Sequence, residues 1–355
     1  MVSYFTKTRV AVVQAAPIWL DADATVDKTI RLMGEAGREG AKLIGFPESW
    51  IPGYPHFLWT ETNSEWPSRF VKRYYENSLE ISSPQIRRIQ QAAMDHEVSV
   101  VLGLSERNAG SLYISQVVID ETGRIQGLRR KFKPTHAERG LFGEGDGSDI
   151  LTFDLPGVGR VGALSCWEHM QPLLKYTMNG LGEQIHVASW PAVTQPYYQP
   201  FTAEAYETIN RMYAMENQCF VLCSTAIFDH AGSTLMADTD AKRQLAHLHG
   251  GTSRIYGPDG TELATPLAPS EEGVLYADID LSDILTAKNV IDQVGHYSRP
   301  SIFRLHVDKS SPKSFEFSGT QGPRDSLDLP VQLGDYPGAP AEQKAFHEFP
   351  SIDLQ

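Results

Sequence analysis

Short apolar segments alternate with amphipathic segments along most of this 355-residue chain. Apolar runs of strand length occupy residues 10–15, 42–46, 99–104, 185–189 and 219–223. Windows with apolar side chains at helical spacing occupy residues 25–38, 84–96, 173–181 and 203–217. Two pairs of segments, 112–119 with 125–132 and 251–255 with 274–279, predict hairpins. The alternation, interrupted by hairpins, indicates an α/β fold with mixed strand directions.

Composition restricts the classes of protein to consider. Hydrophobic residues make up 41% of the chain, which is ordinary for a protein with a large core. The net charge of −13 argues against nucleic-acid binding through a basic surface. No apolar run is long enough to span a bilayer, and the N-terminus lacks the apolar core of a signal peptide. With three cysteines arguing against a disulfide framework, we expect a cytoplasmic protein that binds neither nucleic acid nor membrane.

The last part of the chain has a different composition. From about Val307 onward, prolines occur with many serines, aspartates and glycines, and no periodicity persists. Such a segment favours extended chain over a packed fold. We therefore predict one domain over residues 1–305 and an extended tail over residues 306–355, which is a candidate interaction arm.

Cys166 lies at a predicted strand-to-helix turn. Residues 160–165 read as a strand and residues 167–170 as the start of a helix. Backbone N–H groups and the positive end of a helix favour the thiolate form, so Cys166 is a candidate nucleophile. Cys219 and Cys223 differ, because they share one face of an apolar strand and are expected in the core.

Glu48 follows the strand at 42–46 in a loop rich in proline, glycine and aromatic residues. A rigid apolar loop can hold a carboxylate in a poorly hydrated cleft, where its proton affinity rises toward that of a general base. The alternative is a solvated surface glutamate before a turn.

Four cations gather within residues 129–133. Strand alternation places Arg129, Lys131 and Lys133 on one face and Arg130 with Phe132 on the other. A lysine turned inward would be a fixed positive charge for a developing anion, whereas the alternative is a solvated strand edge. The alternation does not choose between Lys131 and Lys133.

Five segments together resemble the nitrilase superfamily, and specifically its nitrilase branch. They follow one another in the family's order and are residues 46–48, 130–139, 166–169, 180–188 and 295–300. The resemblance covers about residues 8–305 and leaves out the tail. It implies a four-layer α-β-β-α sandwich with mixed sheets.

The resemblance also implies an active site. The family's Glu-Lys-Cys triad falls on Glu48, Lys131 and Cys166, because its lysine directly follows the arginine of an Arg-Lys pair. A second active-site glutamate falls on Glu138. The implied reaction converts a nitrile to a carboxylic acid and ammonia through a thioimidate and a thioester on the cysteine. No metal or organic cofactor is implied.

Substrate contacts are predicted less directly. In the family, a tryptophan after the cysteine accompanies nitrile rather than amide substrates, so Trp167 is expected to shape the pocket, and His296 to support the site. Further aromatic candidates for the pocket wall are Tyr54, Trp59, Trp190 and Tyr198. For each aromatic side chain the alternative is a packed core or subunit contact, and for His296 it is a structural histidine.

Other functions compete with nitrile hydrolysis. An amidase or carbamoylase would use the same triad on a carbonyl carbon, and a cyanide-hydrolysing enzyme would also need it. A non-catalytic assembly module would be expected to have lost a member of the triad, and none is lost. Family members pair through helices, so we expect a homodimer that builds larger homo-oligomers or spirals, with a small nitrile as the other partner.

Overall fold

The computed structural model describes residues 3–62, 64–194 and 201–311 of the chain. Of the predicted tail, residues 312–355 lie outside the described residues, so the boundary at 305 stays a prediction.

Strands form one 11-stranded mixed sheet. Its order is β5-β4-β3-β2-β1-β9-β8-β7-β6, with β10 paired to β9 and β11 paired to β1. The strands are β1 (Lys7–Ala15), β2 (Leu43–Gly45), β3 (Ser99–Asn108), β4 (Ser111–Ile119), β5 (Ile125–Arg130), β6 (Thr152–Leu155), β7 (Gly159–Ser165), β8 (Ile185–Trp190), β9 (Phe220–Ala226), β10 (Arg254–Tyr256) and β11 (Gly273–Asp280).

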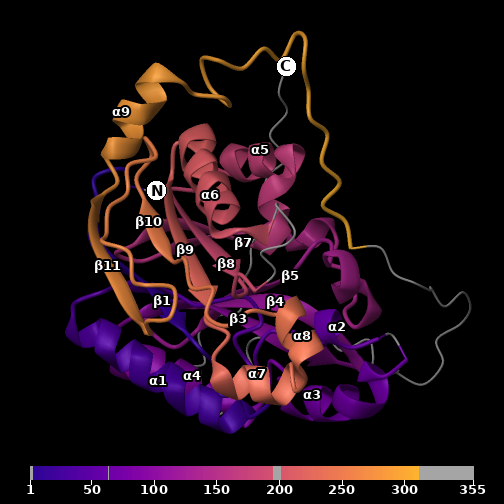
Figure 1. The fold of residues 1–355 in the computed structure, drawn as a ribbon. Coiled ribbons are helices and arrows are strands. Elements are labelled where there is room, and N and C mark those ends of the chain that lie inside the picture. The colour runs from indigo at the N-terminus through magenta and orange to yellow at the C-terminus, as the bar shows by residue number, and fades with distance from the viewer. Residues whose placement is uncertain (1–2, 63, 195–200, 312–355) are drawn as a thin grey trace, which may run out of the picture. The chain divides into compact units, whose positions relative to one another are not determined.

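Helices cover the sheet and its edges (Figure 1). They are α1 (Ala22–Arg38), α2 (Phe57–Thr60), α3 (Lys72–Asn77), α4 (Pro84–Asp95), α5 (Pro172–Gly180), α6 (Ala203–Asn217), α7 (His230–Met236), α8 (Asp240–Leu245) and α9 (Asp283–Val290). The helix predicted from residue 25 begins three residues earlier, because the side chain of Asp21 accepts a hydrogen bond from the Ala24 N–H and caps α1. Among the described helices, none combines the length and apolarity that crossing a membrane requires.

The sheet folds into two layers between β1 and β9. These strands pair only over Gln14–Thr225 and Ala15–Ala226, while the rest of β1 pairs with β11. The inner faces of the two halves share one apolar core, in which Val12 of β1 and Leu222 of β9 are fully buried. The sheet thus supplies the two central layers.

Side chains on the outer faces pack against helices. Val13 of β1 joins a core cluster with Val26 of α1 and Ile89 of α4. Val221 of β9 joins another cluster, with Met178 of α5 and residues of α6. The period of two along each strand therefore separates an inner from an outer core, and Figure 1 shows α1 with α4 on one side and α5 with α6 on the other. The predicted α-β-β-α arrangement is confirmed.

The late hairpin prediction is wrong. Residues 273–280 form β11 but pair antiparallel with β1, and β10 pairs with β9. Apolar periodicity identified both segments as strands, but it carries no information about which strand each one joins. The turn after β10 closes a local bridge between Tyr256 and Glu262 instead.

Three strand ends meet at one edge of this fold. β1, β2 and β3 are mutually parallel, and so are β7, β8 and β9. β5 regains the direction of β3 after two antiparallel pairings. Across the layers, Gln116 of β4 donates to the Leu164 carbonyl at 3.2 Å and the Ser189 hydroxyl at 2.8 Å. The segments after β2, β5 and β7 therefore converge, and they carry the predicted site residues.

Candidate active site

Cys166 occupies a sharp turn directly after β7. It begins a single 3₁₀ turn, Cys166–Met170, and α5 follows only at Pro172. Its φ is +52°, a left-handed value that is costly for a residue with a Cβ and that recurs at functional sites. The predicted strand-to-helix turn is present, with a 3₁₀ turn where a longer helix was expected.

Glu48, Lys131 and Glu138 form a buried ionic cluster. The Lys131 ammonium donates to Glu138 Oε2 at 2.7 Å and to both oxygens of Glu48 at 3.2 Å. All three side chains are essentially inaccessible to solvent. One cation thus holds two carboxylates that come from separate loops.

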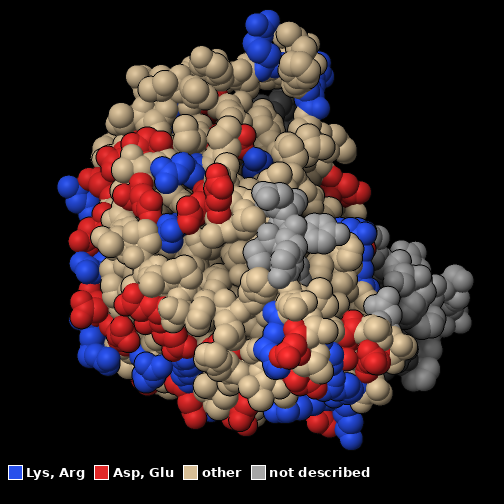
Figure 2. Space-filling view, in the orientation of Figure 1, with Lys and Arg blue, Asp and Glu red and all other residues tan. Residues whose placement is uncertain are grey.

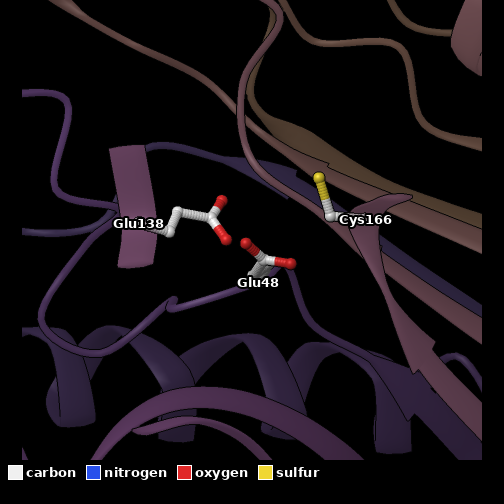
Figure 3. Close-up of side chains that lie close together, drawn as sticks. All are labelled: Glu48, Glu138 and Cys166. Carbon is white, nitrogen blue, oxygen red and sulfur yellow. The ribbon is translucent and has the colours of Figure 1, made fainter. Parts of the chain in front are cut away.

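The two carboxylates face each other beside the sulfur of Cys166 (Figure 3). One oxygen of each carboxylate and the Cys166 sulfur lie within 4.8 Å of one another, a donor set of a size that a metal ion can occupy. The Lys131 ammonium already bridges the two carboxylates at hydrogen-bond distance. It supplies the positive charge that this acidic site needs.

The structure brings Lys131, and not Lys133, to this cluster. β5 ends at Arg130, so Lys131 and Lys133 lie after the strand. The strand alternation that placed them on the same face therefore does not hold for these two residues. Lys133 is 45% exposed and pairs with the surface Glu144. Glu138 is aimed inward by its short 3₁₀ turn, where its carboxylate also accepts the Thr135 N–H at 2.7 Å.

Burial sets the protonation of the cluster. It raises the pKa of Glu48 to about 8, with Lys131 opposing the rise and Glu138 adding to it. Burial alone would lower the pKa of Lys131, but the carboxylates of Glu138 and Glu48 outweigh it and raise that pKa. Burial also raises the pKa of the Cys166 thiol, against the attraction of Lys131. Glu48 can therefore exchange a proton near neutral pH while Lys131 stays charged.

Arg129 and Glu168 connect the segment that carries Lys131 to the turn that carries Cys166. The sequence alone did not reveal this role. The guanidinium makes two hydrogen bonds to the carboxylate, at 2.7 and 2.9 Å, and both side chains are buried. The same carboxylate accepts the Ser165 N–H at 2.8 Å and the Phe132 N–H at 2.7 Å. The strand alternation offered one sequence signal for this role, because it places Arg129 on the same face as Lys131.

A pocket opens above Cys166 and Glu138. Tyr54 lines it and donates to Glu138 Oε1 at 2.8 Å, and Trp59 donates to the Tyr54 hydroxyl at 3.1 Å. The Trp167 ring meets Phe201 edge-on, with centroids 5.1 Å apart. The described lining residues are Tyr54, His56, Trp59, Thr135, Glu138, Cys166, Trp167, Pro191, Ala192, Thr194, Phe201 and Tyr206. Of these, seven were not anticipated: His56, Thr135, Pro191, Ala192, Thr194, Phe201 and Tyr206.

Three other predicted contacts have different placements. Trp190 is fully buried behind the pocket wall, where its indole donates to Asn210 at 3.1 Å, so it supports the wall and does not line it. His296 is exposed beyond α9, in ring contact with Tyr297, and is not among the described residues that line the pocket, so its predicted support of the site stays a prediction. Tyr198 lies outside the described residues.

A family model for carbon-nitrogen hydrolases matches residues 9–289, which include Cys166 and the three residues of the ionic cluster. The chain belongs to the carbon-nitrogen hydrolase family. The resemblance predicted from the five sequence segments is thereby confirmed.

Curated relatives of this carbon-nitrogen hydrolase span most of its length. An aliphatic nitrilase from Rhodococcus rhodochrous is 50% identical over 311 residues, covering 87% of this chain and 85% of that protein. A nitrilase from Pseudomonas syringae pv. syringae (strain B728a) is 52% identical, covering 84% and 88%. An arylacetonitrilase from Aspergillus niger is 45% identical, covering 94% and 99%.

Solved structures support the fold of this carbon-nitrogen hydrolase. The NitFhit protein of C. elegans aligns with a TM-score of 0.67 at 18% identity, over 87% of this chain and 69% of that one. A carbon-nitrogen hydrolase from Helicobacter pylori G27 aligns with a TM-score of 0.65 at 22% identity, over 81% and 94%. At these identities the likeness speaks for the fold alone.

Proposed function

We propose that this enzyme hydrolyses an organic nitrile to the carboxylic acid and ammonia, with Cys166 as the nucleophile. The observation that carries the proposal is the buried Glu48–Lys131–Glu138 cluster beside the Cys166 sulfur, at the floor of a pocket. Relatives at 45–52% identity that are named nitrilases direct the proposal to the nitrile group.

The first half of the reaction forms a thioimidate. Glu48 takes the thiol proton and the sulfur bonds to the nitrile carbon, while one π bond to nitrogen opens. The proton then passes from Glu48 to that nitrogen. A pKa of about 8 for Glu48 suits both transfers, because the group can accept and release a proton near neutral pH.

The second half consumes two molecules of water. The first water, activated by Glu48, adds to the thioimidate carbon, and loss of ammonia leaves a thioester. The second water cleaves the thioester, releasing the acid and returning the thiol. Lys131 and the backbone N–H of Trp167 stabilise negative charge that develops beside the sulfur. Glu138 positions the Lys131 ammonium, and the Tyr54 hydroxyl in turn positions the Glu138 carboxylate.

The pocket favours a nitrile with a flat or compact apolar substituent. Its described wall carries the aromatic rings of Tyr54, Trp59, Trp167, Phe201 and Tyr206. Aromatic rings bind apolar and aromatic groups through large contact area and edge or stacked geometry. We therefore expect arylaliphatic and small aliphatic nitriles to be turned over faster than bulky branched ones.

A substrate panel tests this function. Ammonia release is measured for aromatic, arylaliphatic and aliphatic nitriles, for the matching amides and for cyanide, with the acid and amide products quantified. The proposal expects release from nitriles that is lost in Cys166→Ala. Release from amides alone would replace it with an amidase or carbamoylase, and release from cyanide alone would replace it with a cyanide-hydrolysing enzyme.

We also propose that two copies pair through α5 and α6. Large apolar side chains are exposed on these helices, including Leu173 at 68% and Met212 at 48%. Figure 2 shows both uncharged surface and charged side chains in this region. A patch of exposed apolar side chains marks an interaction surface. Light scattering should report a dimer or a larger assembly for the wild type and a monomer for Leu173→Asp with Met212→Asp. A monomeric wild type would contradict the pairing and the larger spirals built from it.

The chemistry suits a reducing compartment. All three cysteines are free, and a thiolate nucleophile must stay reduced to act. We therefore propose a cytoplasmic location, which fractionation of the source cells with an antibody to the chain can test.

A further inference from the structure

A buried relay of three polar side chains, those of His169, His186 and Glu183, leads from the Cys166 carbonyl to α6. His169 Nδ1 lies 2.6 Å from the Cys166 carbonyl oxygen, and His169 Nε2 lies 2.9 Å from His186 Nε2. His186 Nδ1 lies 2.8 Å from Glu183 Oε2. Solvent reaches almost none of these three side chains. None of them has a part in the steps derived above.

The far end of this relay is fixed by α6. Glu183 Oε1 accepts hydrogen bonds from the Tyr213 hydroxyl at 2.5 Å and from the Asn217 amide at 3.0 Å. The His186 ring also lies against the Tyr213 ring, with centroids 4.0 Å apart. The relay is therefore anchored at both ends, at the nucleophile and at a helix of the outer layer.

Hydrogen-bond chemistry gives the relay a direction. A carbonyl oxygen only accepts, so His169 Nδ1 carries the proton that faces Cys166. Burial, with the nearby His186 adding to it, lowers the pKa of His169 well below its usual value, so this ring is neutral and its Nε2 accepts. His186 Nε2 must then donate. One further proton lies between His186 Nδ1 and Glu183. A single arrangement of protons therefore gives each of the three contacts one donor and one acceptor.

The peptide between Cys166 and Trp167 links this relay to the reacting atom. Burial raises the pKa of the Cys166 thiol, and the neighbouring Trp167 N–H is among the groups that oppose the rise. That N–H and the Cys166 carbonyl belong to the same peptide unit, which is planar. Holding the carbonyl on one side therefore fixes the direction of the N–H on the other. The hydrogen bond on the carbonyl also strengthens the N–H as a donor.

We propose that His169 is a positioning residue for the nucleophile, and that His186 and Glu183 hold it in the required tautomer. The relay aims the Trp167 N–H at the Cys166 sulfur and maintains the left-handed backbone at Cys166. Its effect on turnover rests on the proposed nitrile hydrolysis. Its effect on the reactivity of Cys166 does not.

Two amide substitutions at His169 distinguish the contribution of its Nδ1 from that of its Nε2. The amide nitrogen of His169→Asn reaches the place of Nδ1 and keeps the donor to the Cys166 carbonyl. That of His169→Gln reaches the place of Nε2 and loses this donor. The control is Ser224→Ala, which removes another buried side-chain donor to a backbone carbonyl, at 2.7 Å, in the middle of the sheet.

Alkylation of Cys166 by iodoacetamide, followed by mass spectrometry on the full-length protein, reports the thiolate without any nitrile. We expect His169→Asn and Ser224→Ala to react within about threefold of the wild-type rate. His169→Gln should react roughly 100-fold more slowly, as expected for loss of one aligned N–H donor, with kcat for a nitrile falling in parallel and KM changing little. Equal rates for the Asn and Gln variants would overturn the proposal.

Glu183 provides a second test at the other end of the relay. In Glu183→Gln the amide N–H can donate to His186 Nδ1 while its oxygen still accepts from Tyr213 and Asn217, so the alkylation rate should stay near that of the wild type. Glu183→Leu removes the anchor and should slow alkylation at least about tenfold. A slow Gln variant beside a fast Leu variant would contradict the relay. Nitrile turnover that is absent in the wild type, with this alkylation pattern intact, would count against the proposed function alone.

Discussion

Arg129 and Glu168 form a buried bidentate ion pair that joins the turn carrying Cys166 to the strand end that precedes Lys131. Glu168 lies two residues after Cys166, and Arg129 lies two residues before Lys131. The Glu168 carboxylate also accepts N–H groups from both segments, at Ser165 and Phe132. The distance between sulfur and ammonium is thus set by backbone contacts as well as by the side chains themselves.

Removing one partner of this pair should destabilise the protein strongly. Glu168→Ala leaves the Arg129 guanidinium buried without its carboxylate, which costs about 3–5 kcal/mol of unfolding free energy. Urea denaturation followed by circular dichroism measures the loss. The matched control is Lys133→Ala, which breaks an exposed pair with Glu144 and should cost less than about 1 kcal/mol. Similar losses for the two variants would contradict the assigned role of the buried pair.

The pH dependence of turnover should follow Glu48. Its carboxylate form takes the thiol proton, and its pKa is about 8, so kcat/KM should rise as pH increases through about 8. In Glu138→Gln a negative charge that raises the pKa of Glu48 is removed, so the rising limb should move to lower pH, with a lower kcat. A limb that moves to higher pH, or does not move, would argue against Glu48 as the base.

Lys131 and Lys133 should differ sharply in function. Lys131→Met removes the charge that lies between Glu48 and Glu138, and kcat should fall by about 10²- to 10³-fold. Lys133→Met changes only a surface pair, so its kcat should match that of the wild type. Steady-state kinetics with one good nitrile measures both, and a large loss in the Lys133 variant would be unexpected.

The Tyr54 hydroxyl should contribute to catalysis through Glu138. Tyr54→Phe keeps the ring that lines the pocket but removes the donor to the Glu138 carboxylate, 2.8 Å away. We expect kcat to fall roughly tenfold, as for one hydrogen bond to a charged group, while KM changes less. A change in KM alone would indicate that Tyr54 contacts the substrate and does not orient Glu138.

Sequence reasoning predicted the layers of this fold better than its connections. Val10, Val12 and Leu222 face the inner core and Val13 and Val221 face the helices. All five lie in continuous apolar runs, so the runs predicted strands, and the four-layer arrangement came from the resemblance. The pairing of β11 with β1 was not predicted, because it joins segments more than 250 residues apart and depends on how the sheet folds. The same limit applies to helices α2, α3, α7 and α8, which are short and lack a long apolar period.

The reactive residues of the site could be predicted from the sequence, because their types and their order along the chain match the family's motifs. Glu48, Lys131, Glu138 and Cys166 meet as the resemblance implied. The alternation could not separate Lys131 from Lys133, because it gives no signal for where β5 ends. His169 escaped notice for a different reason. Its role depends on contacts with a carbonyl group and with another strand, which only the folded chain brings together.

A covalent intermediate on Cys166 is the most direct evidence that this cysteine is the nucleophile in nitrile hydrolysis. Acid-quenched samples taken during turnover of a nitrile can be digested and weighed by mass spectrometry. We predict that the peptide containing Cys166 gains the mass of the thioimidate or thioester, and that Cys166→Ala shows neither the adduct nor turnover. Undiminished nitrile hydrolysis by Cys166→Ala would contradict this prediction.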